Sequence, residues 1–242
     1  MALIIDYEKK ADSKYGTVFG TGSEVSKMLA DLTTAIHSTK IKNGNELENF
    51  LQKTSRYEKK CYENKEFKEK KHVKEIMELK KTTIITKLKV PTGRKKEGKN
   101  EFAAIDSIKV CPSEKTIFLI EIKDGDNFDT KKVEGEQDKL GRAVEYLQEL
   151  SPDWKVEPRF ILFCRKEGDS SPIPSNFSAR YQTNGWILNG DTGADFLGTS
   201  RAKVDLSRSI DQEQNVKCGL NACLRIIEAA GLSAPQSKEV VQ

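Results

Sequence analysis

The stretch TIFLIEIK, residues 116–123, constrains the fold more than any other part of the chain. Its apolar run Ile117–Ile120, followed by Ile122, predicts a strand that is buried on both faces. The preceding segment EFAAIDSIKV, residues 101–110, predicts a second strand, and PSEK, residues 112–115, predicts the turn between them. Two apolar strands side by side need helices over both faces, so we expect an α/β domain.

Pairing the two strands around this turn brings charged residues together within an apolar sheet. With Cys111 opposite Thr116, Asp106 lies directly across from Glu121, at a Cβ separation of about 5 Å. Lys123 shares their face, because alternate residues of a strand project to the same side. A shift of one residue in the register would move Asp106 to the other face.

Two carboxylates this close repel each other by about 3 kcal/mol even at an effective dielectric constant of about 20, before desolvation is counted. A cation at this point, or a proton on one acid, is therefore required. Mg²⁺ suits a site with one or two carboxylates and several waters, and a neighbouring lysine can then stabilise or deprotonate a nucleophilic water. The alternative is an ion pair at the end of the sheet, in which Lys123 pairs with Asp106 or Glu121.

The remaining elements alternate between helices and strands, which indicates a central mixed sheet flanked by helices. Helices are expected at about 22–38, from about 45, at 58–81, 134–150 and 211–230, and strands at 82–90, 159–166 and 185–190. We expect one domain over 1–242, with a mainly helical part at 1–82, the sheet core at 83–190, and a C-terminal helix and tail at 191–242.

Composition excludes several classes of site. The five cysteines form no C-x-x-C pair, which argues against a disulfide framework or a zinc site. The two histidines, His37 and His72, have no second histidine or cysteine at ligand spacing, so Ser-His-Asp, Cys-His and zinc-histidine mechanisms are not expected. The chain shows neither a signal peptide nor a membrane span, and we expect a cytoplasmic protein.

The net charge of +4 is unevenly distributed along the chain. Residues 53–99 contain seventeen lysines and arginines, seven glutamates and no aspartate. This excess favours a basic face that meets a polyanion. The alternative is a solvated helix, since Glu and Lys alternate there at helical spacing.

Asp106 followed by Glu121-Ile122-Lys123 resembles the signature of the PD-(D/E)XK nuclease superfamily, although Ile105 replaces the proline of that name. Residues 44–51, GNELENFL, are similar to a helix that often precedes the core hairpin and supplies a further glutamate, here Glu48, with Glu46 as an alternative. The resemblance implies a restriction-endonuclease-like core. It is strongest to type II restriction endonucleases.

The resemblance implies Mg²⁺-dependent, site-specific hydrolysis of double-stranded DNA by a prokaryotic homodimer. It assigns Asp106, Glu121 and the backbone carbonyl of Ile122 to the metal. Lys123 would orient or activate the attacking water, and Glu48 would act through the water shell of the metal. A repair or junction nuclease of the same fold and a non-catalytic nucleic-acid-binding module are the alternatives.

Candidate DNA contacts follow from charge and side-chain chemistry. The basic loop before the catalytic strand and the lysines after it suit phosphate contacts. These residues are Arg94, Lys95, Lys96, Lys131 and Lys132. Arginines and amides at 165–189 suit base edges in the major groove. They are Arg165, Arg180, Gln182, Asn184 and Asn189.

Overall fold

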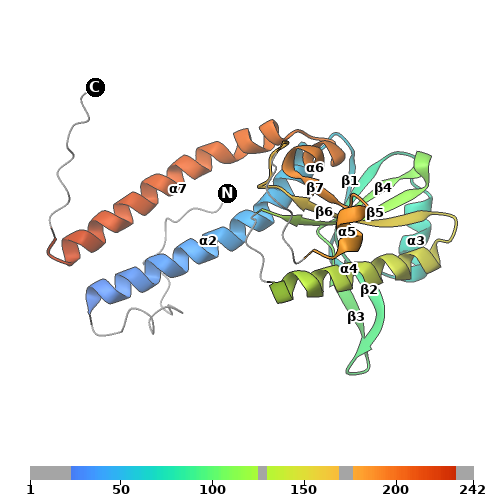
Figure 1. Ribbon diagram of the computed structural model, residues 1–242, viewed down its shortest axis with the longest axis horizontal. Helices are drawn as coiled ribbons and strands as arrows, with labels where there is room; N and C mark the ends of the chain where they lie inside the picture. Colours follow the sequence, from blue (N-terminus) through green and yellow to red (C-terminus); the bar gives the residue numbers. More distant parts are fainter. Residues whose placement is uncertain (1–22, 125–129, 169–176, 233–242) are drawn as a thin grey trace. The chain divides into compact units, whose positions relative to one another are not determined.

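The computed structural model describes residues 23–124, 130–168 and 177–232 (Figure 1). The chain forms two compact units. The sheet unit comprises Glu48–Val204, and the helical unit comprises Met1–Leu47 together with Asp205–Gln242. Both boundaries fall within long helices, so each of these helices contributes to both units.

The sheet unit is built on a mixed, curled seven-stranded sheet, which confirms the expected α/β class with helices flanking a mixed sheet. The order is β1-β2-β4-β5-β6-β7, and β3 pairs with β2 outside this path. The strands are β1 (Glu58–Glu66), β2 (Thr83–Lys96), β3 (Lys99–Ala104), β4 (Ser107–Cys111), β5 (Thr116–Lys123), β6 (Lys155–Leu162) and β7 (Ile187–Asn189). The β1/β2, β5/β6 and β6/β7 pairs are parallel, and the other pairs are antiparallel.

The helices are α2 (Glu24–Thr54), α3 (Glu69–Met77), α4 (Thr130–Leu150), α5 (Ala179–Thr183), α6 (Gly190–Phe196) and α7 (Arg201–Ala229), with a 3₁₀ turn at Pro112–Glu114. Helix α4 packs on one face of the sheet, where Leu140 and Leu147 join Ile117 and Leu119 in the main core cluster. All five residues of β4 are buried. The central strands are therefore covered on both faces, as the apolar run predicted.

The predicted register of the β4–β5 hairpin is confirmed. Cys111 pairs with Thr116, and Ser107 pairs with Ile120. The same register, continued by one residue, places Asp106 opposite Glu121. Lys115, which closes the turn, has the left-handed φ of 47° that reverses the chain here.

The prediction of a helix at 58–81 is wrong. The structure has β1 followed by the short helix α3. Strand β1 lies at the edge of the sheet, where charged side chains are tolerated and limit pairing with other chains. Its alternating Glu and Lys residues gave the segment the appearance of a solvated helix.

Three further boundaries differ from expectation. The two helices expected between 22 and 51 form the single helix α2, so Gly44 lies within a helix despite its cost of about 1 kcal/mol relative to alanine. Strand β2 continues through Pro91 to Lys96, and the last helix begins at Arg201. At Pro91 the strand pairs only with β3. No described strand pairs with it on the other side, where the missing N–H would cost a hydrogen bond.

The strand expected over 101–110 is also divided, because the chain breaks at Ile105 and Asp106. Before the break β3 pairs with β2, in a hairpin that extends past α4 (Figure 1). After the break β4 returns to the sheet between β2 and β5. The break also interrupts the alternation of side chains between the two faces of the sheet. Ala103 and Ile105 therefore belong to the same core cluster as Ile108.

The helical unit has a small core of its own. Leu32 and Ala35 of α2 and Ala222 and Ile226 of α7 are buried together. Other apolar side chains of α7 face solvent, among them Val216, Leu220 and Leu224. Within the described residues, none of the helices has the length and apolar character needed to cross a membrane.

Candidate active site

Acidic side chains from four parts of the sheet unit gather around Lys123. Strand β5 places Glu121 and Lys123 on one face, because they are two residues apart. Asp106 comes from the break before β4, and Glu136 comes from the second turn of α4. Glu48 of α2 is close enough to Asp106 and Glu121 that its charge raises the pKa of Asp106, while the charge of Glu121 raises the pKa of Glu48.

Asp106 is held at the end of the sheet by a bond across the strand pair. The backbone N–H of Ile122 donates to Asp106 Oδ2 at 2.7 Å. Gln52, one turn after Glu48 on α2, fixes the backbone at the break. Its Nε2 donates to the carbonyl of Asp106 at 3.4 Å and to Ser107 Oγ at 3.2 Å.

The ammonium of Lys123 lies between two carboxylates. Its Nζ is 2.6 Å from Glu121 Oε1 and 2.9 Å from Glu136 Oε2, and the Lys123 side chain is 20% exposed. The ion pair considered as an alternative is therefore present, but in the register that also places Asp106 opposite Glu121. The two interpretations of these residues are compatible.

Burial and mutual repulsion raise the pKa values of three carboxyl groups. Burial, and then the charge of Glu48, raises the pKa of Asp106 from 3.8 to about 7. Burial, and then Asp106, raises the pKa of Glu121 from 4.5 to about 8. Burial, and then Glu121, raises the pKa of Glu48 to about 7. These groups compete for protons near neutral pH, and a bound cation would relieve their repulsion.

The neighbouring carboxylates keep the Lys123 side chain charged. Burial lowers its pKa, but Glu121 and Glu136 together outweigh burial and raise the pKa above its usual value. Lys123 is therefore an ammonium at neutral pH. It can donate hydrogen bonds to a water or to an anionic oxygen, but it cannot accept a proton in this arrangement.

The side chains fit a hard divalent cation that retains much of its water. In the described part of the chain, no three His, Cys, Asp or Glu side chains are grouped to hold a metal ion by themselves. Mg²⁺ needs only one or two protein carboxylates, with water and substrate oxygens completing its shell. Asp106 and Glu121, half-buried with raised pKa values, are the donors that such an ion would stabilise.

The predicted DNA-contact residues have different environments. Arg94 and Lys95 are exposed on the β2–β3 hairpin, and Arg180 is exposed on α5 with its guanidinium 5.3 Å from the ring centre of Trp186. Arg165 is buried at 7% exposure. The side chains of Lys96, Lys131 and Lys132 lie outside the described residues.

The candidate base-reading amides also differ. Gln182 donates to the carbonyl of Phe177 at 2.8 Å, while Asn184 is exposed. Asn189 has a structural role as the N-cap of α6, since its Oδ1 accepts from Thr192 N–H at 2.8 Å.

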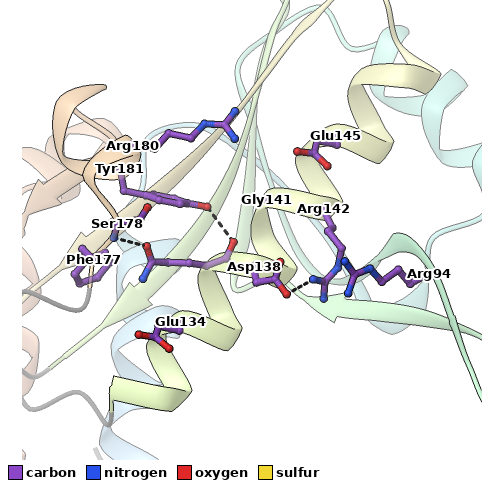
Figure 2. Close-up of a pocket in the computed structure, with 11 residues that line it drawn as sticks. Arg94, Glu134, Asp138, Gly141, Arg142, Glu145, Phe177, Ser178, Arg180 and Tyr181 are labelled. Carbon is purple, nitrogen blue, oxygen red and sulfur yellow. Dashed lines mark hydrogen bonds and ion pairs between the residues drawn. The ribbon is translucent and has the colours of Figure 1, made fainter.

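A separate pocket of about 560 Å³ lies beside α4 (Figure 2). Tyr181 closes one side of it and donates its hydroxyl to the carbonyl of Gln137 at 3.1 Å. Arg94, Arg142 and Arg180 contribute positive charge to its lining. Lys123 and its carboxylates are not among the lining residues, so the pocket is distinct from the acidic cluster.

Sequence reasoning missed two members of the site. Glu136 lies three residues after Val133 and four before Leu140, on the apolar stripe of α4 that faces the sheet. A carboxylate on such a stripe was the available signal. Gln52 shares a helix face with Glu48, which is four residues earlier.

Comparison of the chain with protein-family models, with curated proteins and with solved structures finds no match.

Proposed function

We propose that this protein is a Mg²⁺-dependent nuclease that hydrolyses phosphodiester bonds in double-stranded DNA, with the restriction-endonuclease-like core that its motif resembles. One observation carries the proposal. Asp106, directly before β4, lies beside Glu121 of β5, and Lys123 stands beside them as an ammonium. Phosphodiester hydrolysis needs these parts, because charge develops on phosphate oxygens as water attacks.

Each side chain has a role in this proposal. Asp106, Glu121 and the carbonyl of Ile122 would hold Mg²⁺, which when bound lowers the pKa of water and neutralises phosphate charge. Lys123 donates a hydrogen bond to the attacking water or to a phosphate oxygen. Glu48, with a pKa of about 7, can take up a proton near neutral pH.

We further propose that cleavage is site-specific and that the protein acts as a homodimer. A two-fold symmetric dimer matches a palindromic site and can cut both strands. The stripe of Val216, Leu220 and Leu224 on α7 supports self-association. These side chains are 62%, 60% and 45% exposed and recur every four residues, on one side of the helix.

A plasmid-cleavage assay with Mg²⁺ tests the activity. Discrete fragments support a restriction enzyme, and sequencing their ends gives the recognition site. Smeared or structure-dependent products support a repair or junction nuclease. Binding without cleavage supports the non-catalytic module and contradicts the enzyme.

Variants assign the site. Asp106→Ala and Lys123→Ala should abolish cutting, whereas Asp153→Ala, an exposed position in the turn after α4, should cut as the wild type does. DNA binding measured with Ca²⁺ in place of Mg²⁺ should change little in the three variants. Full cutting by either of the first two would remove that residue from the site.

A further inference from the structure

The β2–β3 hairpin has a basic tip that extends beyond the rest of the sheet unit (Figure 1). Residues Glu97 and Gly98 form its two-residue loop, with φ values of 51° and 78°. Positive φ at both positions is typical of the type I′ turn, whose twist matches that of the paired strands. The described side chains at 93–95 and 97–100 are exposed. The tip is therefore a regular two-stranded ribbon surrounded by solvent.

The charges of this ribbon favour a polyanionic partner. The segment RKKEGKN, residues 94–100, has four basic residues and one acidic residue. Lys96 and Lys99 are also directly paired across the strands.

The ribbon is fixed to the helix that also reaches the catalytic lysine. Glu101 accepts a hydrogen bond from Thr92 Oγ1 at 2.8 Å and forms an ion pair with Arg142 of α4 at 3.2 Å. The Glu101 and Arg142 side chains are only 22% and 12% exposed. Glu136, which contacts Lys123, is six residues before Arg142, a distance of about 9 Å along the helix. The ribbon thus has a defined position relative to the acidic cluster.

The backbone makes a second connection between the ribbon and the acidic cluster. Strand β3 ends at Ala104, two residues before Asp106. A strand bulge between Pro91 and Lys95, with Gly93 at a φ of 71°, bends the ribbon where it passes α4. Beyond Pro91 the five residues of β2 span about 17 Å. That length and a two-stranded width suit the major groove of DNA, which is about 12 Å wide.

We propose that this ribbon lies in the major groove of the DNA duplex, next to the bond that is cut, with Arg94, Lys95 and Lys99 against the phosphates that border the groove. The inference rests on the proposed action on DNA. Of the basic residues at 53–99, the proposal assigns DNA contacts only to those of the hairpin tip.

The test compares two triple variants of the full chain. Arg94→Ala/Lys95→Ala/Lys99→Ala removes charge from the tip. Lys71→Ala/Lys74→Ala/Lys81→Ala removes the same charge from exposed side chains on α3 and before β2. Binding to a mixture of short random-sequence duplexes is measured with Ca²⁺ as salt is varied. The tip variant should lose affinity roughly 100-fold at 0.1 M salt, with a slope of log K against log salt shallower by about 2.7. The control should retain both values.

Partial methylation of the same duplexes with dimethyl sulfate tests the groove, since guanine N7 faces the major groove. Duplexes bound by the wild type should be depleted of N7-methylguanine. Equal losses in the two triple variants, an unchanged slope in the tip variant, no duplex binding by the wild type, or bound DNA depleted only of minor-groove N3-methyladenine would overturn the inference. Because binding is measured without cleavage, a protein that binds through the tip but cuts no DNA with Mg²⁺ would refute the nuclease and retain the ribbon.

Discussion

Glu136 of α4 forms an ion pair with Lys123 of β5, with Glu136 Oε2 and Lys123 Nζ 2.9 Å apart. This contact joins the first part of α4 to the end of the sheet where Asp106 and Glu121 lie. It also gives the lysine a second carboxylate, which helps to keep its side chain charged after burial.

Replacement Glu136→Gln should reduce cleavage roughly tenfold, because Lys123 loses one of its two acidic partners and is less firmly positioned. Single-turnover cleavage measures this effect. Glu134→Gln, at an exposed position two residues earlier, is the matched control. Cleavage by Glu136→Gln at the wild-type rate would exclude the positioning role.

The contribution of the acidic cluster to the stability of the metal-free protein should fall as the pH rises from about 4 to about 8. The pKa values of Asp106, Glu48 and Glu121 are raised to about 7, 7 and 8, so the folded chain binds more protons than the unfolded chain in this window. Their stabilising contribution is complete below the unfolded pKa values and is lost as the pH rises through the folded ones.

Asp106→Asn should therefore stabilise the metal-free protein at pH 8, by on the order of 1 to 3 kcal/mol, and change it little at pH 4. Asparagine keeps an oxygen that can accept from Ile122 N–H, so the main change is the loss of charge. Thermal unfolding in a chelator at several pH values measures this. The same midpoint for variant and wild type at pH 8 would show that the acidic cluster carries no repulsion.

Metal binding should release protons at pH 7. Asp106 and Glu121 are partly protonated there, and both must ionise to bind a cation. Titration calorimetry with Mg²⁺ or Ca²⁺ in two buffers of different ionisation enthalpy should give about one proton per ion. In Glu121→Gln both the binding and the proton release should be lost. Heats that do not depend on the buffer would contradict the assigned ligands.

Self-association should depend on the apolar stripe of α7. Leu220→Glu places a charge in the stripe and should convert a dimer into a monomer, whereas Asn221→Glu, at the next exposed position and about 100° around the helix, should not. Light scattering after size-exclusion chromatography gives the mass of each species. A monomeric wild type, or a dimeric Leu220→Glu variant, would remove this surface from the proposal.

The hairpin that forms the acidic site could be predicted because several local signals agree there. The turn at 112–115 is short, and the residues on both sides are apolar enough to make both strands central. Under those conditions the register follows from counting, and the positions of Asp106 and Glu121 follow from the register.

Other features depend on contacts that the local sequence does not determine. Strand β1 is polar because it lies at an edge, and the order of strands is set by distant parts of the chain. The break at Ile105 and Asp106 separates two strands that both pair with β2, of which only β4 also pairs with β5, and a continuous apolar pattern does not indicate it. Glu136 could have been identified, since a charged group on the buried side of a helix needs a partner.

The attachment of the ribbon to α4 separates sequence changes that the protein can tolerate from changes that it cannot. The insertion of one residue between Glu136 and Arg142 would rotate one of them by about 100° relative to the other. It would break either the contact of Glu136 with Lys123 or the contact of Arg142 with Glu101. The tip residues 93–95 and 97–100 have no such constraint, because they face solvent. The tip can therefore diverge, or be exchanged by an engineer for another hairpin of equal length, while the spacing within the helix remains constant.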